Sequence, residues 1–238
     1  MLNRDRLIVA LDVSSAAQAR QVVQSIGESA ITYKVGKQLF TAEGPQVVRD
    51  LVASGRKVFL DLKFHDIPNT VAGAVGEAAK LGVSMLTVHA SGGAKMLRAA
   101  AESAAQSSGK PTVLAVTVLT SFSDADLLEV GFRGNVITQV IMLGRLAREA
   151  GCGGLVASAR EARELRRELG EDFAIVTPGI RMGGATTRPD DQARALTPKE
   201  AIAAGATYLV VGRPILEAAD PTQAAAAIVR EIGEAAGN

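Results

Sequence analysis

The sequence contains no tryptophan, one cysteine and two histidines among its 238 residues. The single cysteine, Cys152, excludes a disulfide bond within the chain and a metal centre built from several thiolates. Small residues surround Cys152 ahead of an apolar run, which favours a packing role over a nucleophilic one. His65 and His89 lie far apart in the sequence, so no histidine motif points to zinc or to a catalytic triad.

Aromatic residues make up 3% of the chain, and 26 basic side chains nearly balance 25 acidic ones. Proteins that bind nucleic acid usually present a basic surface, often with aromatic rings on which bases stack. Neither feature is present here, so we expect no nucleic-acid partner.

Long apolar runs are also absent. The first run, residues 7–11, ends at Asp12 after five residues and is too short for a secretion signal. No run approaches the ~18 residues that would span a bilayer. We therefore expect a cytoplasmic protein that does not act at a membrane.

Short apolar runs alternate with helical patterns along the whole chain. The predicted strands are residues 7–12, 31–36, 57–63, 84–89, 111–118, 153–157, 173–176 and 207–211. The predicted helices are residues 15–26, 38–54, 69–81, 92–107, 135–150, 159–169, 198–204 and 221–236. Such regular alternation predicts a parallel sheet. Eight units without a linker favour a single-domain TIM (β/α)₈ barrel over residues 1–238, rather than an open doubly wound sheet.

Three segments depart from simple alternation. Residues 122–134 are rich in Asp and Gly and are expected to be irregular. The Arg and Glu residues of the predicted helix 159–169 repeat at spacings of three and four, which is typical of surface ion pairs. The loop from Arg181 to about Gln192 is long for a compact domain, and such loops are usually functional or mobile.

The predicted strand 57–63 leads into the most informative segment, residues 61–70. Side chains alternate between the faces of a strand, so Asp61 and Lys63 should point the same way and form an ion pair. Asp66 lies three residues further on, which would bring a second carboxylate to the same strand end. The alternative is a plain salt bridge at a strand end, with Asp66 as the N-cap of a helix that begins at Pro68.

Polar residues recur where the other predicted strands end. In a barrel of parallel strands these ends meet at one mouth, which is where barrel enzymes have their active sites. The sequence therefore predicts a catalytic mouth formed by Asp12, Lys34, Asp61, Lys63, His89, Thr120, Pro178, Gly212 and Arg213.

Glycine and arginine follow the seventh and eighth predicted strands, as Gly179-Ile-Arg181 and Gly212-Arg213. Many barrels bind phosphate at these two places, because glycine lets the backbone approach an oxyanion and arginine donates two parallel hydrogen bonds. A phosphorylated small molecule is the expected ligand. The alternative is that the glycines only form turns and the arginines only carry surface charge.

These motifs together resemble the orotidine 5′-phosphate decarboxylase family. The resemblance rests on Asp61-x-Lys63-x-x-Asp66-Ile-Pro-Asn-Thr70, Asp12, Lys34, Thr177-Pro-Gly-Ile-Arg181 and Val211-Gly-Arg-Pro214. It implies an enzyme that converts orotidine 5′-phosphate to uridine 5′-phosphate and CO₂, the last step of pyrimidine synthesis. It also implies that the enzyme needs neither a metal nor an organic cofactor, and that it works as a homodimer with shared active sites.

The resemblance also implies roles for individual residues. Lys63 would deliver a proton to C6 of the pyrimidine, flanked by Asp61 and Lys34, and Asp66 would belong to the catalytic group but come with Thr70 from the partner subunit. The substrate would be bound by Asp12, Lys34, Asp61, Thr70, Thr120, Ser121, Pro178, Arg181, Gln192, Gly212 and Arg213. The resemblance gives no role for His89, which is expected to pack in the core or behind the site.

The chemistry suits these residues. Loss of CO₂ from C6 leaves a carbanion that the ring does not delocalise, and the sequence has no motif for a cofactor that could accept the electrons. A lysine ammonium held between carboxylates can stabilise that charge and then donate its proton. Two rivals stay open: a Mg²⁺-dependent sugar-phosphate decarboxylase or aldolase of the same superfamily, and a catalytically silent phosphate-binding barrel.

Overall fold

The strands close into a barrel. The structure is a computed structural model that describes residues 1–182, 196–235 and 237. In this part of the chain eight strands pair in parallel, each with the next, and the last pairs with the first. They are β1 (Leu7–Ala10), β2 (Thr32–Gly36), β3 (Lys57–Phe64), β4 (Met85–His89), β5 (Thr112–Val116), β6 (Gly154–Val156), β7 (Ala174–Thr177) and β8 (Tyr208–Val211). The predicted TIM barrel is confirmed.

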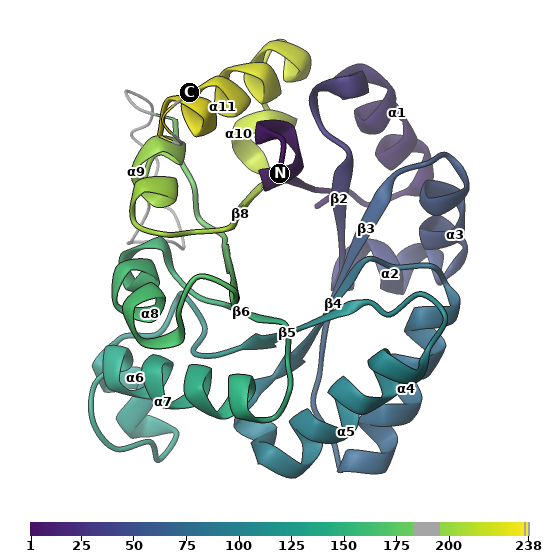
Figure 1. The fold of residues 1–238 in the computed structure, drawn as a ribbon. Helices are drawn as coiled ribbons and strands as arrows, with labels where there is room; N and C mark the ends of the chain where they lie inside the picture. Colours follow the sequence, from purple (N-terminus) through teal and green to yellow (C-terminus); the bar gives the residue numbers. More distant parts are fainter. Residues whose placement is uncertain (183–195, 236, 238) are drawn as a thin grey trace.

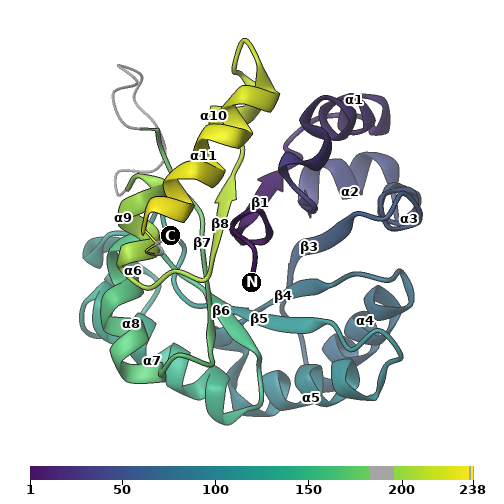
Figure 2. The same cartoon turned by 45° about the horizontal axis from the view of Figure 1, so that its top comes forward.

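Helices form a ring outside the strands (Figures 1 and 2). They are α1 (Ala16–Ile26), α2 (Lys37–Glu43), α3 (Gln46–Ala53), α4 (Pro68–Lys80), α5 (Gly93–Gln106), α6 (Asp124–Glu129), α7 (Val136–Glu149), α8 (Ala162–Leu169), α9 (Pro198–Ala203), α10 (Arg213–Leu216) and α11 (Pro221–Ala235). A short 3₁₀ turn, η1 (Asn3–Arg6), contacts β1, β8 and α11 at the N-terminal end of the barrel (Figure 1). None of these helices is long and apolar enough to cross a membrane.

The predictions for residues 38–54 and 122–134 were wrong. The helix predicted over residues 38–54 is divided into α2 and α3, because Gly44 adopts a left-handed φ of 66° and Pro45 has no N–H to continue the helix. Residues 122–134, expected to be irregular, contain α6. The Ser123 hydroxyl accepts from the N–H of Asp126, and the Asp126 carboxylate accepts from the N–H of Ser123.

The surface ion pairs predicted for residues 159–169 are wrong in part. Glu161 is buried, and the Arg166 side chain is only 13% exposed. The Arg166 guanidinium donates to the carbonyl oxygens of Gly170, Phe173 and Gly205, at 2.7 to 2.9 Å. Burial lowers the Arg166 pKa below its ordinary value. This arginine therefore ties α8 to the loops that precede β7 and β8.

Two apolar layers follow from strand alternation. One fills the inside of the barrel and consists of Ile8, Ala10, Phe59, Met85, Leu114, Val176 and Val210. The other lies between the strands and the helices, and it includes Leu7, Val9 and Cys152. Cys152 is 5% exposed, which agrees with the packing role indicated by the sequence. Because the inner layer fills the barrel, space for a ligand remains at the carboxyl ends of the strands.

Candidate active site

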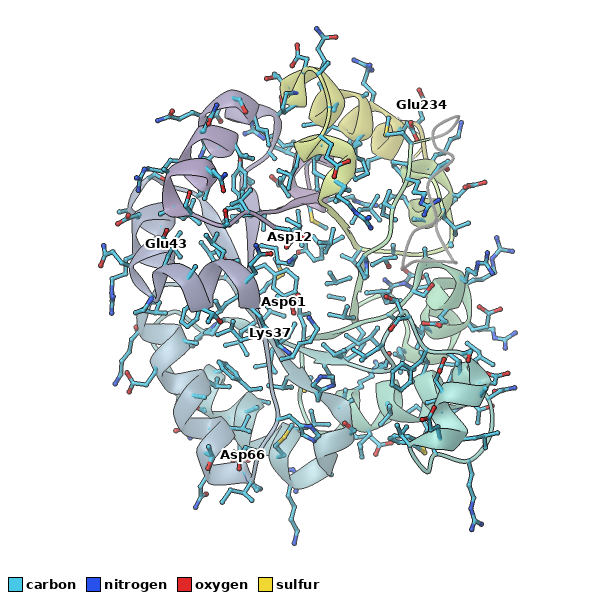
Figure 3. The ribbon with its side chains drawn as sticks, turned by 180° about the vertical axis from the view of Figure 1, so that it is seen from behind. Asp12, Lys37, Glu43, Asp61, Asp66 and Glu234 are labelled. Atoms are coloured by element: carbon cyan, nitrogen blue, oxygen red, sulfur yellow. The ribbon has the colours of Figure 1, made fainter. Side chains whose placement is uncertain are left out.

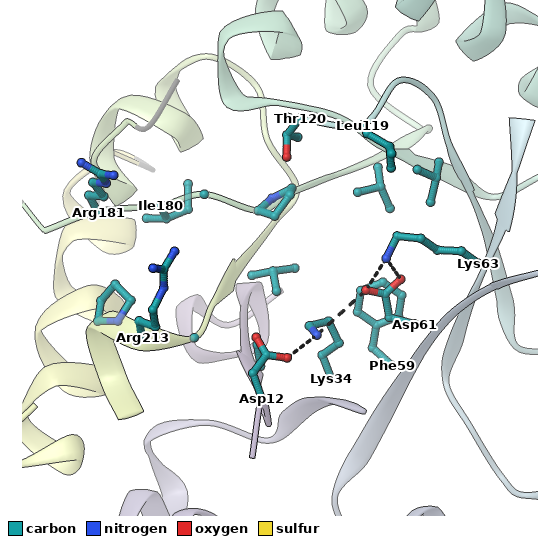
Figure 4. Close-up of a pocket in the computed structure, with 18 of the residues that line it drawn as sticks. Asp12, Lys34, Phe59, Asp61, Lys63, Leu119, Thr120, Ile180, Arg181 and Arg213 are labelled. Carbon is teal, nitrogen blue, oxygen red and sulfur yellow. Dashed lines mark hydrogen bonds and ion pairs between the residues drawn. The ribbon is translucent and has the colours of Figure 1, made fainter. Parts of the chain in front are cut away.

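A cavity of about 660 Å³ opens at the carboxyl ends of the strands (Figure 4). Its size suits a small ligand, since ligand pockets usually measure about 300 to 1,000 Å³. Most residues that the sequence placed at the mouth line it together: Asp12, Lys34, Asp61, Lys63, Thr120, Pro178, Arg181, Gly212 and Arg213.

Three predicted site residues, Ser121, Asp66 and Thr70, are exposed and lie outside the lining, and His89, also expected at the mouth, does not line the cavity either. Gln192 falls outside the described residues. Seen from the mouth, Asp66 lies well apart from Asp61 (Figure 3). The expectation that both carboxylates gather at one strand end within a single chain is therefore wrong.

Asp66 does not act as the N-cap of α4 either. The N-cap is Ile67, whose side chain makes no capping bond, and Pro68 occupies the first turn of the helix. The Asp66 carboxylate instead accepts a hydrogen bond of 2.6 Å from the N–H of its neighbour Ile67. This contact directs the carboxylate toward the start of α4 and leaves it exposed.

Alternating charges run along one side of the cavity (Figure 4). The Lys34 ammonium lies 2.9 Å from Oδ1 of Asp12 and 3.9 Å from Oδ2 of Asp61. The Lys63 ammonium lies 2.7 and 2.8 Å from the two carboxylate oxygens of Asp61, which confirms the predicted ion pair. The side chains of Lys34 and Asp61 are only 12% and 14% exposed. Such shielding from water strengthens the attraction between them.

The backbone at Lys63 has an unusual conformation. Its φ is 55°, in the left-handed region that residues with a Cβ atom rarely adopt, and such strain is of order 1 kcal/mol or more. The pairing register between β3 and β4 shifts between Leu60 and Phe64. The N–H of Lys63 donates to the hydroxyl of Thr87 on β4 at 2.9 Å. No sequence pattern singles out Thr87, because its contacts depend on how two strands are paired.

Two glycines make room for the charged side chains. A Cβ atom on Gly36 would lie 2.9 Å from the Lys34 ammonium, and one on Gly212 would lie 3.3 Å from Oδ2 of Asp12. Gly36 is not among the site residues that the sequence predicts, although it follows Lys34 by two residues and therefore lies on the same face of β2. Any larger residue at position 36 would displace the ammonium.

The two histidines, far apart in the sequence, lie close together in the fold. The ring centroids of His65 and His89 are 5.4 Å apart, with the planes tilted by 43°. Burial lowers the pKa of His89 below its ordinary value of 6.5, and the nearby charges of His65, Lys63 and Lys37 lower it further. His89 is therefore a half-buried group whose neutral form is favoured by its surroundings, in line with the packing role expected for it.

The opposite end of the cavity carries two arginines (Figure 4). Arg213 begins the short helix α10 directly after β8, and Arg181 follows β7. Gly179, between Pro178 and Ile180, has a φ of 78°, so the chain turns there in a conformation that suits glycine. Backbone and guanidinium donors from both loops therefore border one end of the cavity.

The described residues include no group of three or more His, Cys, Asp or Glu side chains arranged to hold a metal ion. Asp61, the least exposed carboxylate at the mouth, already accepts from Lys63 with both of its oxygens. What the arrangement offers chemically is two fixed ammonium groups at one end and two guanidinium groups at the other.

Comparisons with known proteins agree with this geometry. Residues 5–228 match the Orotidine 5'-phosphate decarboxylase / HUMPS family. An orotidine 5'-phosphate decarboxylase of Idiomarina loihiensis is 50% identical over 229 residues, which cover 96% of this chain and 98% of that protein. The one from Neisseria meningitidis serogroup A is 49% identical over 233 residues, covering 98% and 93%. The crystal structure of the Lactobacillus acidophilus enzyme, 39% identical, superposes with a TM-score of 0.84 over 96% of this chain and 99% of that chain. The chain thus belongs to the orotidine 5′-phosphate decarboxylase / HUMPS family.

Proposed function

We propose that this protein converts orotidine 5′-phosphate to uridine 5′-phosphate and CO₂, the last step of pyrimidine synthesis. The observation that carries the proposal is a single cavity of about 660 Å³ with two ammonium groups at one end and two arginines at the other. A nucleoside monophosphate carries its phosphate at one end and its base at the other. The names of the relatives support the same reaction.

Lys63 is the proposed proton donor. When CO₂ leaves C6, the electron pair of the broken C–C bond stays on C6, and a nearby ammonium stabilises that charge as it develops. Lys63 then transfers a proton to C6 as general acid. Asp61 holds the ammonium in place with both oxygens, and Lys34 provides a second positive charge at 3.9 Å from the same carboxylate. No electron sink outside the chain is needed for these steps.

The remaining lining residues supply substrate contacts in this proposal. Asp12 and Lys34 bind the ribose hydroxyls, while Thr120 and Pro178 border the pyrimidine. Phosphate binds to the guanidinium groups of Arg181 and Arg213 and to the backbone at Gly212, where the turn after β8 leads into a short helix. Ser121 and Gln192 remain predicted contacts to the base and phosphate. Binding energy gained at the phosphate can help hold the reacting end in place.

We also propose a homodimer in which Asp66 and Thr70 serve the site of the partner. Both residues are exposed and do not line the cavity of their own chain. Ile67, between them, is 67% exposed, the highest exposure of any large apolar side chain among the described residues. An apolar residue flanked by such polar groups suits a contact with a second copy of the chain.

The proposed reaction uses neither a metal nor an organic cofactor, whereas the sugar-phosphate rival in the same superfamily needs Mg²⁺. To coordinate a cation, Asp61 would have to release Lys63, which occupies both of its oxygens. The cytoplasmic location expected from the sequence stays a prediction.

Turnover of orotidine 5′-phosphate, followed by its change in ultraviolet absorbance, tests the function directly. We expect activity that survives dialysis against EDTA. Turnover of a sugar phosphate that disappears with EDTA and returns with Mg²⁺, without turnover of orotidine 5′-phosphate, would favour the sugar-phosphate rival. Tight binding of uridine 5′-phosphate without any turnover would instead identify a silent phosphate-binding barrel.

A further inference from the structure

Thr87 lies behind the Asp61–Lys63 pair and contacts both residues. It belongs to β4 and is fully buried. Its Oγ1 atom lies 3.0 Å from Oδ1 of Asp61 and 2.9 Å from the backbone nitrogen of Lys63. One hydroxyl thus connects the carboxylate that holds the ammonium with the backbone that carries it.

The directions of these two bonds follow from the groups involved. The backbone N–H of Lys63 can only donate, so the Thr87 oxygen accepts from it. The single hydroxyl proton then remains for Asp61, whose ionised carboxylate can only accept. Since the same Oδ1 atom accepts from the Lys63 ammonium, the bonds form a closed loop from the Lys63 backbone through Thr87 and Asp61 to the Lys63 side chain.

The Lys63 backbone requires such a partner. From Leu60 to Phe64 the strand β3 advances four residues, whereas β4 advances two, from Leu86 to Val88. This mismatch takes the Lys63 N–H out of the regular ladder, and a buried N–H without a partner is strongly disfavoured. In the described part of the chain only Lys63 and Lys110 combine a positive φ with a side chain.

We propose that Thr87 is a positioning residue for the proposed decarboxylation. Its hydroxyl replaces the missing ladder bond at Lys63, which keeps the left-handed backbone in place, and it fixes the rotamer of Asp61 at the same time. Thr87 does not line the cavity, so it acts on the reaction through Lys63 and Asp61. This inference rests on the proposed function, and it explains what holds Lys63 and Asp61 in place at the reacting end of the cavity.

Three variants separate the hydroxyl from the rest of the side chain. Thr87→Val keeps the shape but removes both hydrogen bonds, and Thr87→Ser restores the hydroxyl. Thr117→Val is the matched control, since Thr117 is also a buried threonine at the end of a strand, but its hydroxyl donates only to the carbonyl of Val156. If Thr87→Val does not fold, Thr87→Ala removes the same two bonds without placing a methyl group against the Asp61 carboxylate and the Lys63 N–H.

The measurements are kcat and KM for orotidine 5′-phosphate, the Kd of uridine 5′-phosphate, and a crystal structure of each variant. We expect kcat of Thr87→Val to fall by ~10²-fold, because a displacement of about 1 Å at a reacting group can have that effect. The Kd should change by less than about threefold, since the phosphate end is untouched. Thr87→Ser should recover most of kcat, and Thr117→Val should keep it.

The crystal structures separate this inference from the proposed function. If the wild-type protein does not turn over orotidine 5′-phosphate, the proposed function fails, while a changed φ at Lys63 in Thr87→Val still supports the positioning role. The inference is overturned if that variant keeps the φ of Lys63 and the Asp61 rotamer. It is also overturned if kcat stays within threefold of an active wild type, or if Thr87→Ser is as impaired as Thr87→Val.

Discussion

The Lys63 ammonium lies 2.7 Å from one carboxylate oxygen of Asp61 and 2.8 Å from the other. The two residues are two positions apart on the same strand, where side chains share a face. A bidentate contact of this kind fixes the position of the nitrogen more closely than a single hydrogen bond does. Both residues line the cavity at the carboxyl ends of the strands.

Replacing Lys63 tests the proton donor. We expect Lys63→Ala to lose at least ~10² in kcat, because removal of a general acid alone has about that effect. The fold should remain, since the Lys63 side chain is 24% exposed and does not belong to the apolar core. Circular dichroism and binding of uridine 5′-phosphate serve as controls. Turnover within a few-fold of wild type would show that another group donates the proton.

Strand alternation explains why part of this site was predictable. Asp61 and Lys63 share a face whatever the strand pairs with, so their ion pair could be inferred from spacing alone. The left-handed backbone of Lys63 and its bond to Thr87 depend on a register shift between β3 and β4. No local pattern encodes that shift.

The spacing of charged residues along a helix also does not predict which of them are buried. Arg166 lies at the spacing of a solvent-exposed helix face, yet its guanidinium donates to the carbonyl oxygens of Gly170, just beyond the helix, and of Gly205, which is distant in the chain. The split between α2 and α3 could have been predicted, because Gly44 and Pro45 are adjacent and each disfavours a continuous helix.

Replacing Arg213 tests the phosphate end of the cavity. A charge-assisted hydrogen bond contributes about 1.5 to 3 kcal/mol, so Arg213→Ala should weaken uridine 5′-phosphate binding by roughly tenfold to a hundredfold. Uridine, which lacks the phosphate, should bind equally to both proteins. Isothermal titration with the two ligands measures the difference, and Arg230→Ala, an exposed arginine on α11, is the matched control. Equal losses for both ligands would give Arg213 a structural role.

Burial of His89 predicts a pH dependence of stability. The folded protein holds the pKa of His89 below its ordinary value of 6.5, mainly through desolvation. Between the two pKa values the unfolded chain binds more protons, so the free energy of unfolding falls as the pH drops below 6.5. The full contribution is present above that pH. The groups that face His89 are His65, Lys63, Lys37 and Asp61.

Urea unfolding of His89→Gln at several pH values measures this effect. We expect the variant to lose less stability than wild type as the pH falls from about 8 to 5, which spans the ordinary range of histidine titration. The difference in free energy of unfolding between the two proteins at the upper pH reports the lost packing. The difference in how steeply that free energy changes with pH reports the titration of His89. Parallel profiles for the two proteins would show that His89 does not contribute to the acid sensitivity.

Arg166 provides a test of stability away from the cavity. Replacing it with methionine removes the donor from three part-buried carbonyl oxygens, and an unsatisfied buried group costs about 1 to 3 kcal/mol. We expect Arg166→Met to lower the free energy of unfolding by about 2 to 4 kcal/mol. Arg163→Met, an exposed position on the same helix, should change it by less than about 0.5 kcal/mol. Similar values for the two variants would contradict the buried role.

The proposed dimer predicts that two inactive variants restore each other. If Asp66 serves the site of the partner, a dimer of one Lys63→Ala chain and one Asp66→Asn chain has one site with both substitutions and one site with neither. Random exchange makes about half of the dimers mixed, so roughly a quarter of wild-type activity should return in a two-fold symmetric pair. The physical basis is the exposed Asp66 carboxylate, which contacts the N–H of Ile67 and does not line the cavity of its own chain.

Subunit exchange must be measured independently, for example by mass spectrometry of isotopically labelled chains. Each variant alone, taken through the same mixing protocol, gives the background. Ile67→Asp provides a second test, because a charge at this exposed position would have to be buried in the proposed dimer contact. The variant should shift toward monomer in analytical ultracentrifugation, and kcat should fall together with the dimer fraction. If exchange is complete and no activity returns, Asp66 acts within its own chain. A fully active monomer would exclude the shared site altogether.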